Sequence, residues 1–221
     1  MEKTREPAIQ VKNLYKIFRV GNEKVRALNG VDLTIYKGEF CAIVGTSGSG
    51  KSTMLNMLAG LEKPTKGEVI VAGEHLEKMN ENQLVKFRRE HVGFIFQSFN
   101  LLGTMNAIEN VALPLTFRGV DKKIREAKAV EMLKLVGLPK HMKHRPNEMS
   151  GGQQQRVAFI RALCQPFDFI FLDEPISHLD DDNSRIMGEL IIAEAKAQGA
   201  GVIATSIGKH IELPYNHTLQ L

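Results

Sequence analysis

The sequence predicts an α/β fold with a mostly parallel sheet, an N-terminal antiparallel β subdomain and an inserted helical subdomain. Short apolar–polar alternation at residues 9–11 and 31–35 indicates antiparallel strands. Uniformly apolar runs at residues 40–44 and 169–172 indicate strands that are buried on both faces. Helical segments separate these runs from each other and from a strand expected at residues 202–205, and such alternation implies crossovers and a parallel sheet.

The elements follow one another without an internal repeat. After the first buried strand, Met54, Leu55 and Leu58 recur at helical spacing and predict a helix. The next long stretch reads as mostly helical, with Asp121 as a helix N-cap. Helices at about residues 152–164 and 186–197 and a last strand at residues 218–221 complete the pattern. We expect a single domain over residues 1–221 with a helical subdomain at about residues 80–150.

The composition is that of an ordinary globular protein. The 221 residues are 43% hydrophobic and 24% charged, and the net charge of +4 is too small to indicate nucleic acid as the partner. The N-terminus lacks the apolar segment of a secretory signal, and no apolar run is long enough to span a bilayer. Cys41 and Cys164 lack metal-ligand neighbours, so we expect buried thiols in a reducing cytosol.

A glycine-rich loop follows the first buried strand and precedes a helix. It matches the phosphate-binding loop pattern, and a plain glycine turn with a solvated lysine is disfavoured by this context. Glycines allow backbone N–H groups to wrap a phosphate, Lys51 reaches the β- and γ-phosphates, and the Ser52 hydroxyl binds Mg²⁺. The sequence therefore predicts a P-loop NTPase core. The expected nucleotide-binding residues here are Gly45, Thr46, Ser47, Gly48, Ser49, Gly50, Lys51, Ser52 and Thr53.

Two carboxylates end the apolar strand at residues 169–172. Asp173 is expected to hold Mg²⁺, and Glu174 is expected to orient the attacking water. Alone, such a pair more often belongs to a solvated turn or a helix cap. The phosphate-binding loop upstream reverses that balance.

A second glycine-containing helix start lies at Ser150, Gly151, Gly152 and Gln153. Its free N–H groups form another anion-binding site, although a single nucleotide seldom needs two in one monomer. Without the phosphate-binding loop, an ordinary glycine turn would be the better interpretation.

These four residues resemble the signature of the ATP-binding-cassette ATPases, with Met149 where leucine is usual. The resemblance covers nearly the whole chain, and the motifs occur in the family's order. It implies ATP and Mg²⁺ as ligands and a head-to-tail homodimer, in which the phosphate-binding loop of one copy and the signature of the other enclose each ATP.

The same resemblance assigns further residues. Gln97 is implied to sense Mg²⁺ and the γ-phosphate, and Ser177, His178 and Asp180 resemble the loop that contacts the second copy. Phe18 stands where the family places an aromatic side chain that stacks on adenine. A core role for Phe18 is nearly as good an interpretation, and Tyr15 is a rival for the stacking role.

One position departs from the family. Where a histidine that touches the γ-phosphate is usual, this chain has Ser206, which lacks both the charge and the reach of an imidazole. Slow hydrolysis is one consequence, and His210 is a candidate substitute. His141 and His144, three residues apart, are better interpreted as a solvated face than as a metal site.

The segments 92–102 and 106–111 look most like the branch that serves lipoprotein release, macrolide export and the division-associated transporter. We therefore expect an ATPase that powers a separate integral membrane permease from the cytoplasmic face of the cell membrane. The alternatives are a slowly hydrolysing regulatory switch and a soluble cassette protein acting on DNA or ribosomes.

Overall fold

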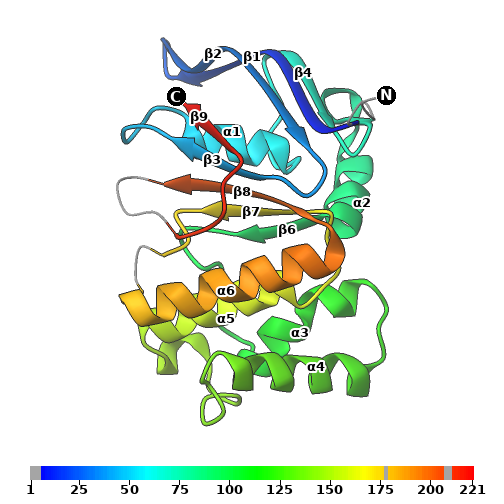
Figure 1. Cartoon of the computed structure of the whole chain (residues 1–221), viewed down its shortest axis with the longest axis vertical. Helices are drawn as coiled ribbons and strands as arrows, with labels where there is room; N and C mark the ends of the chain where they lie inside the picture. Colours follow the sequence, from blue (N-terminus) through cyan, green and yellow to red (C-terminus); the bar gives the residue numbers. More distant parts are fainter. Residues whose placement is uncertain (1–5, 177–178, 207–210) are drawn as a thin grey trace.

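The computed structural model describes residues 6–176, 179–206 and 211–221. Within them the strands form an antiparallel sheet, sheet A, and a parallel sheet, sheet B (Figure 1). Helix α1 lies between the two sheets, and α5 and α6 lie on the other side of sheet B, with α3 and α4 beyond them. The expected α/β class with its antiparallel N-terminal part is confirmed.

Sheet A has the order β2-β1-β4-β5, so β1 and β2 form a long hairpin and β4 and β5 extend the sheet on the β1 side. The two expected strands at residues 9–11 and 31–35 lie within it, with Ile9 opposite Ile35. Both strands are longer than the pattern predicted because the hairpin tip is exposed, so apolar alternation fades there. The strands are β1 (Pro7–Val20), β2 (Glu23–Tyr36), β4 (Lys66–Val71) and β5 (Glu74–His75).

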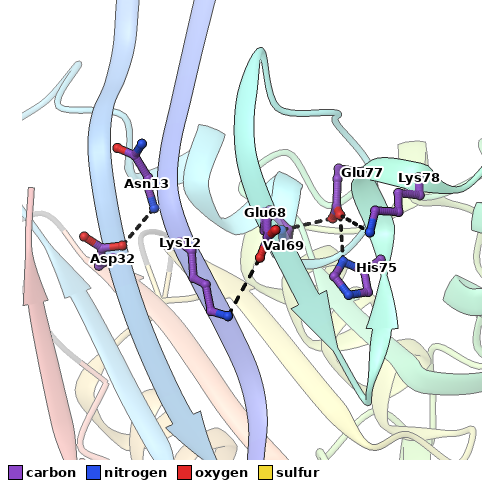
Figure 2. A network of polar contacts seen from close by, with 8 residues as sticks. All are labelled: Lys12, Asn13, Asp32, Glu68, Val69, His75, Glu77 and Lys78. Carbon is purple, nitrogen blue, oxygen red and sulfur yellow. Dashed lines mark hydrogen bonds and ion pairs between the residues drawn. The ribbon is translucent and has the colours of Figure 1, made fainter.

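Polar contacts fasten the strands of sheet A to one another (Figure 2). Glu77 accepts the backbone N–H of Val69 at 3.1 Å and pairs with His75 at 2.7 Å. Partial burial raises the pKa of Glu77, but the hydrogen bonds from Val69 and His75 outweigh it and lower the pKa overall. On the neighbouring strands, the Asn13 backbone N–H donates to Asp32 at 2.8 Å.

Sheet B has the order β6-β7-β8-β3-β9, and its neighbouring strands run parallel throughout the described residues. The arrowheads of β3, β7 and β8 point to the same side in Figure 1, so their carboxyl ends share one edge. Ligands of parallel α/β sheets bind at that edge. The strands are β3 (Phe40–Val44), β6 (Val92–Ile95), β7 (Phe169–Asp173), β8 (Gly201–Ser206) and β9 (His217–Gln220).

Helix starts follow the capping residues in the sequence. Asn80 and Asn106 each form a capping box, with Gln83 and Glu109 respectively, and Asp121 caps α4 as expected. The stretch expected to be mostly helical also contains strand β6, which joins sheet B. The helices are α1 (Lys51–Leu58), α2 (Glu81–His91), α3 (Ala107–Phe117), α4 (Lys122–Leu135), α5 (Gly151–Leu163) and α6 (Asp181–Gln198), with short 3₁₀ turns at Leu76–Lys78 and Pro146–Glu148.

The apolar core has two parts, one on each face of sheet B. Met54, Leu55 and Leu58 of α1 are fully buried between the sheets. On the other face, apolar residues of α3, α4, α5 and α6 pack together, with Phe159 fully buried. Among the described residues, no helix combines the length and the apolar character needed to cross a membrane.

Candidate active site

The predicted site residues from three strands converge at the carboxyl edge of sheet B. The phosphate-binding loop follows Val44 at the end of β3, and Ser206 at the end of β8 is its register partner. Asp173 ends β7 and is paired with Thr205. Parallel register alone therefore brings together residues more than a hundred positions apart in sequence.

Small residues are required in the loop because its backbone is tightly curved and closely packed. Gly50 has φ +96°, and a Cβ there would lie 2.3 Å from the Ala27 carbonyl oxygen of β2. A Cβ on Gly45 would lie 2.4 Å from Ser49 Oγ. Thr46, Ser47 and Gly48 form the exposed crest of the loop.

The lysine of the loop is held within the loop itself. Lys51 is only 4% exposed, and its Nζ donates to the carbonyls of Gly45 at 3.0 Å and Thr46 at 2.8 Å. The hydroxyl of Ser49 is buried with no hydrogen-bond partner in the described part of the chain. A buried cation and an unsatisfied hydroxyl at the start of helix α1 fit a phosphate group.

Ser52 and Asp173 meet directly. Ser52 Oγ donates to Asp173 Oδ1 at 2.9 Å, and the same carboxylate oxygen accepts from Thr205 Oγ1 at 2.7 Å. Asp173 is buried, so its carboxylate depends on these donors. A hydroxyl and one carboxylate are the hard oxygen donors that suit Mg²⁺, which keeps several waters and phosphate oxygens as its other ligands. The residues present therefore fit a magnesium ion.

Glu174 is held by one residue of β8 and by one residue that follows β6. Its φ of +47° is a left-handed conformation that a side chain with a Cβ adopts only when its surroundings impose it. Its backbone N–H donates to Thr205 Oγ1 at 3.1 Å, and its Oε2 accepts from Gln97 Nε2 at 3.0 Å. Gln97 is exposed beyond the end of β6, so this contact links the carboxylate to the surface.

The signature motif forms a separate cluster at the start of α5. Ser150 is the N-cap, its Oγ accepting from the Gln153 backbone N–H while Gln153 Oε1 accepts from the Ser150 N–H. Gly151 and Gly152 form the first turn, where backbone N–H groups have no acceptor within the helix. Buried Gln155 of the same helix donates to the Pro175 carbonyl, which follows Glu174.

Asp180 is exposed and caps helix α6. Its Oδ1 accepts the Asn183 backbone N–H at 2.8 Å, and the Asn183 side-chain amide donates to both carboxylate oxygens. These hydrogen bonds, together with the nearby charge of Arg156, lower the pKa of Asp180. Arg156 also donates to Asn183 Oδ1, which ties the signature helix to α6. Ser177, His178 and His210 lie outside the described residues.

Of the two candidate aromatics on β1, Phe18 lies near the tip of the β1–β2 hairpin and Tyr15 lies further along the strand, opposite Asn29. Phe18 is half-buried opposite Val25, with Lys16 Nζ 4.9 Å from its ring centroid. Tyr15 is occupied elsewhere, because its hydroxyl packs against Gly30, where a Cβ would lie only 3.0 Å away. This packing favours Phe18 over Tyr15 as the ring free to meet a ligand.

Thr205 is the site residue that sequence reasoning missed. From the sequence it is only the last residue of the strand expected at residues 202–205, yet its hydroxyl contacts both Asp173 and Glu174. The sequence does contain a signal for Thr205. A threonine at the end of a buried parallel strand has a hydroxyl that needs hydrogen-bond partners, and the acidic end of another strand can supply them.

Comparison with known proteins identifies the family. Residues 28–177 match the family model described as ABC transporter. The chain is 46% identical over 182 residues to an uncharacterized ABC transporter ATP-binding protein of Thermotoga maritima, a match covering 82% of this chain and 78% of that protein. It is 40% identical over 206 residues to the macrolide export ATP-binding/permease protein MacB of Shewanella sp. strain ANA-3, covering 93% of this chain. The chain spans only about a third (31%) of that MacB relative.

Solved structures agree with this result. The ATP-binding cassette MJ0796, in a dimeric structure of a post-hydrolysis state bound to ADP and Pi, superposes with a TM-score of 0.86 at 40% identity. That match covers 90% of this chain and 87% of the other. A second dimeric structure of MJ0796 gives a TM-score of 0.84. By motifs, fold and overall similarity, the chain belongs to the ABC transporter family, as one of its ATP-binding proteins.

Proposed function

We propose that this chain is the energising subunit of a membrane transporter, which binds two MgATP at a homodimer interface, closes, and reopens on hydrolysis. One observation carries the proposal. A continuous set of hydrogen bonds joins Ser52, Asp173, Thr205, Glu174 and Gln97 at the sheet edge that bears the phosphate-binding loop. Such a set positions a triphosphate, a magnesium ion and a water at one place.

Each residue then has a distinct role in phosphoryl transfer. Lys51 exchanges its two carbonyl partners for phosphate oxygens and balances their charge. Glu174 accepts a hydrogen bond from the attacking water and orients it. Gln97, which donates to Glu174, connects the site with the protein surface. Ser52 and Asp173, with Gln97, would hold Mg²⁺, which screens the negative charge of the phosphates.

The division of the site into two clusters supports a dimer. Ser150, Gly151, Gly152 and Gln153 offer a second anion-binding helix start that is separate from the phosphate-binding loop. A head-to-tail pair would complete each ATP site with the signature of the other copy, as the dimeric structures of MJ0796 make reasonable at 40% identity. Asp180 and the neighbouring loop would lie at this interface, and Phe18 would stack on adenine.

A groove beside Gln97 supports contact with a permease. Its volume is about 560 Å³, and its lining includes Phe96, next to Gln97, and Phe117, a residue that is 67% exposed. Arg88 and Arg161 border it. We propose that a permease helix with apolar and acidic residues occupies it, because the MacB relatives are fused ATP-binding/permease proteins of which this chain spans about a third (31%). The chain would then work at the cytoplasmic face of the cell membrane.

Ser206 favours a second candidate, a regulatory switch with slow hydrolysis. A serine hydroxyl at the end of β8 cannot supply the charge of an imidazole to the γ-phosphate. The presence of Glu174 and of the hydrogen bonds that hold it favours retained ATP hydrolysis. A soluble cassette acting on nucleic acid is less well supported, since the net charge is only +4.

The test compares wild type with Glu174→Gln. Removing the carboxylate should lower ATP turnover by about 10²–10⁴-fold while ATP-dependent dimerisation persists. Turnover is measured by phosphate release and dimerisation by light scattering after gel filtration, in saturating MgATP. A Glu174→Gln protein that remains monomeric would overturn the proposal. Wild type that dimerises without turnover would favour the switch.

A further inference from the structure

The loop between α4 and α5 places a histidine against the signature motif. Nε2 of His141 lies 3.1 Å from Nε2 of Gln153, the third residue of α5. The loop is anchored on another side, since the Ile108 backbone N–H of α3 donates to the Met142 carbonyl. His141 is thus half-buried in a fixed segment and differs from the solvated face expected from the sequence.

The orientation of the Gln153 amide decides which atom donates. Its Oε1 accepts the Ser150 backbone N–H at 3.0 Å, so the atom that faces His141 is the amide nitrogen, which can only donate. Nε2 of His141 must therefore accept. This requires a neutral imidazole whose proton is on Nδ1, because an imidazolium, or the tautomer protonated on Nε2, would oppose N–H to N–H.

Nothing else among the described contacts favours that tautomer. The rings of His141 and His144 meet edge to face, with centroids 5.0 Å apart and planes at 89°. Nδ1 of each ring is buried and has no hydrogen-bond partner among the described residues. A buried N–H without a partner costs free energy, so the contact with Gln153 is what stabilises a proton on Nδ1 of His141.

We propose that His141 is a positioning residue for the signature motif. Gln153 is held at both ends of its amide, by the Ser150 N–H at Oε1 and by the His141 ring at Nε2. The amide in turn fixes the backbone at Ser150, and with it the N–H groups of the first turn of α5. This role rests on the proposed function, because the contact would hold the signature N–H groups in position to bind the ATP on the second copy.

The first test reads the tautomer directly. In protein labelled with ¹⁵N-histidine, the His141 ring is assigned by its absence in His141→Gln, and its nitrogen shifts are measured without nucleotide. Nδ1–H with an unprotonated Nε2 is expected, as is a change of the Gln153 side-chain amide signals in His141→Leu. A ring protonated on Nε2 would overturn the proposal whatever the protein does with ATP.

The second test measures closure in the Glu174→Gln background. His141→Leu should raise the dissociation constant of the MgATP-dependent dimer by about threefold to tenfold for each signature. This change corresponds to the loss of one net hydrogen bond. His141→Gln should restore it, because the Gln Oε1 can reach the position of the imidazole Nε2 and accept. His144→Phe is the matched control, because it keeps an aromatic edge against His141 and the described part of the chain shows no hydrogen bond between His144 and Gln153. ATP affinity of the monomer should be equal in all variants, because the phosphate-binding loop is untouched.

The outcomes separate the two proposals. If the Glu174→Gln parent dimerises and adding His141→Leu leaves its dimer equally tight, the role of His141 is overturned and the proposed function stands. Failure of His141→Gln to restore closure likewise overturns only the role of His141. A Glu174→Gln parent that stays monomeric overturns the proposed function, and with it the role of His141 in closure.

Discussion

The hydroxyl of Thr205 lies 2.7 Å from Asp173 Oδ1 and also accepts the backbone N–H of Glu174 at 3.1 Å. One buried side chain therefore sets the distance between the expected magnesium ligand and the expected catalytic carboxylate. Thr205 is 1% exposed, so water cannot replace it. Its place in β8, directly opposite Asp173 of β7, makes this bridge possible.

Replacing Thr205 with valine keeps the shape of the side chain and removes the bridge. We expect ATP turnover to fall by about tenfold to hundredfold, because small displacements of catalytic groups are costly. The loss of a donor to a buried carboxylate should also lower the free energy of unfolding by about 1–3 kcal/mol. Phosphate release and thermal unfolding without nucleotide measure the two effects.

Thr205→Ser is the control for that substitution. It retains a hydroxyl that can donate to Asp173 and should keep most of the turnover. Equal turnover in Thr205→Val and wild type would contradict the bridging role.

Gly50 and Gly21 separate steric conflict from backbone strain. Both have left-handed φ values, +96° and +61°, but a Cβ on Gly50 meets the Ala27 carbonyl at 2.3 Å, whereas one on Gly21 meets nothing within 4 Å. Gly21→Ala should cost about 1–2 kcal/mol from the left-handed conformation alone. Gly50→Ala should cost more and abolish ATP binding. Urea unfolding and nucleotide titration test this, and equal stability losses would count against the close packing of the loop on β2.

Ser206→His tests the position that departs from the family. Ser206 ends β8 next to Val44, which leads into the phosphate-binding loop. We expect the imidazole to raise turnover, because it adds a cationic donor near the expected γ-phosphate. The rate is measured at saturating MgATP beside Ser206→Asn, a neutral donor of similar size. If Ser206→His is no faster than Ser206→Asn, charge at this position is unimportant for hydrolysis.

The two thiols should be unreactive in the folded protein. Burial, with the nearby negative charge of Glu39, raises the pKa of Cys41 to about 12, and burial raises that of Cys164 to about 11. Both values exceed 9.0, the ordinary pKa of a cysteine thiol. The folded state therefore binds these protons more tightly, and stability from this source falls as pH rises above about 9.

Labelling with iodoacetamide at pH 8 checks this prediction. Cys41 and Cys164 should react only after addition of denaturant, and mass spectrometry of the labelled peptides distinguishes them. Fast labelling of either thiol in native buffer would contradict its burial.

Local pattern was sufficient where a few neighbouring residues determine the structure. The phosphate-binding loop, the capping of α4 by Asp121 and the buried strands at β3 and β7 all follow from residue type and spacing. Strand β6 was not separated from its helical surroundings, because a four-residue apolar run has no periodicity of its own. The capping boxes of α2 and α3 are local signals that also mark helix starts in the sequence.

The sequence by itself predicted a phosphate-binding loop at residues 45–52 and the acids that could assist it, because those features depend on backbone conformation and on the order of neighbouring residues. The tertiary structure decided which side chains meet. Thr205 reaches Asp173 across 32 positions through strand register, and His141 reaches Gln153 through the packing of a loop on a helix start. Contacts of this kind depend on how distant segments pack, and no local pattern encodes them.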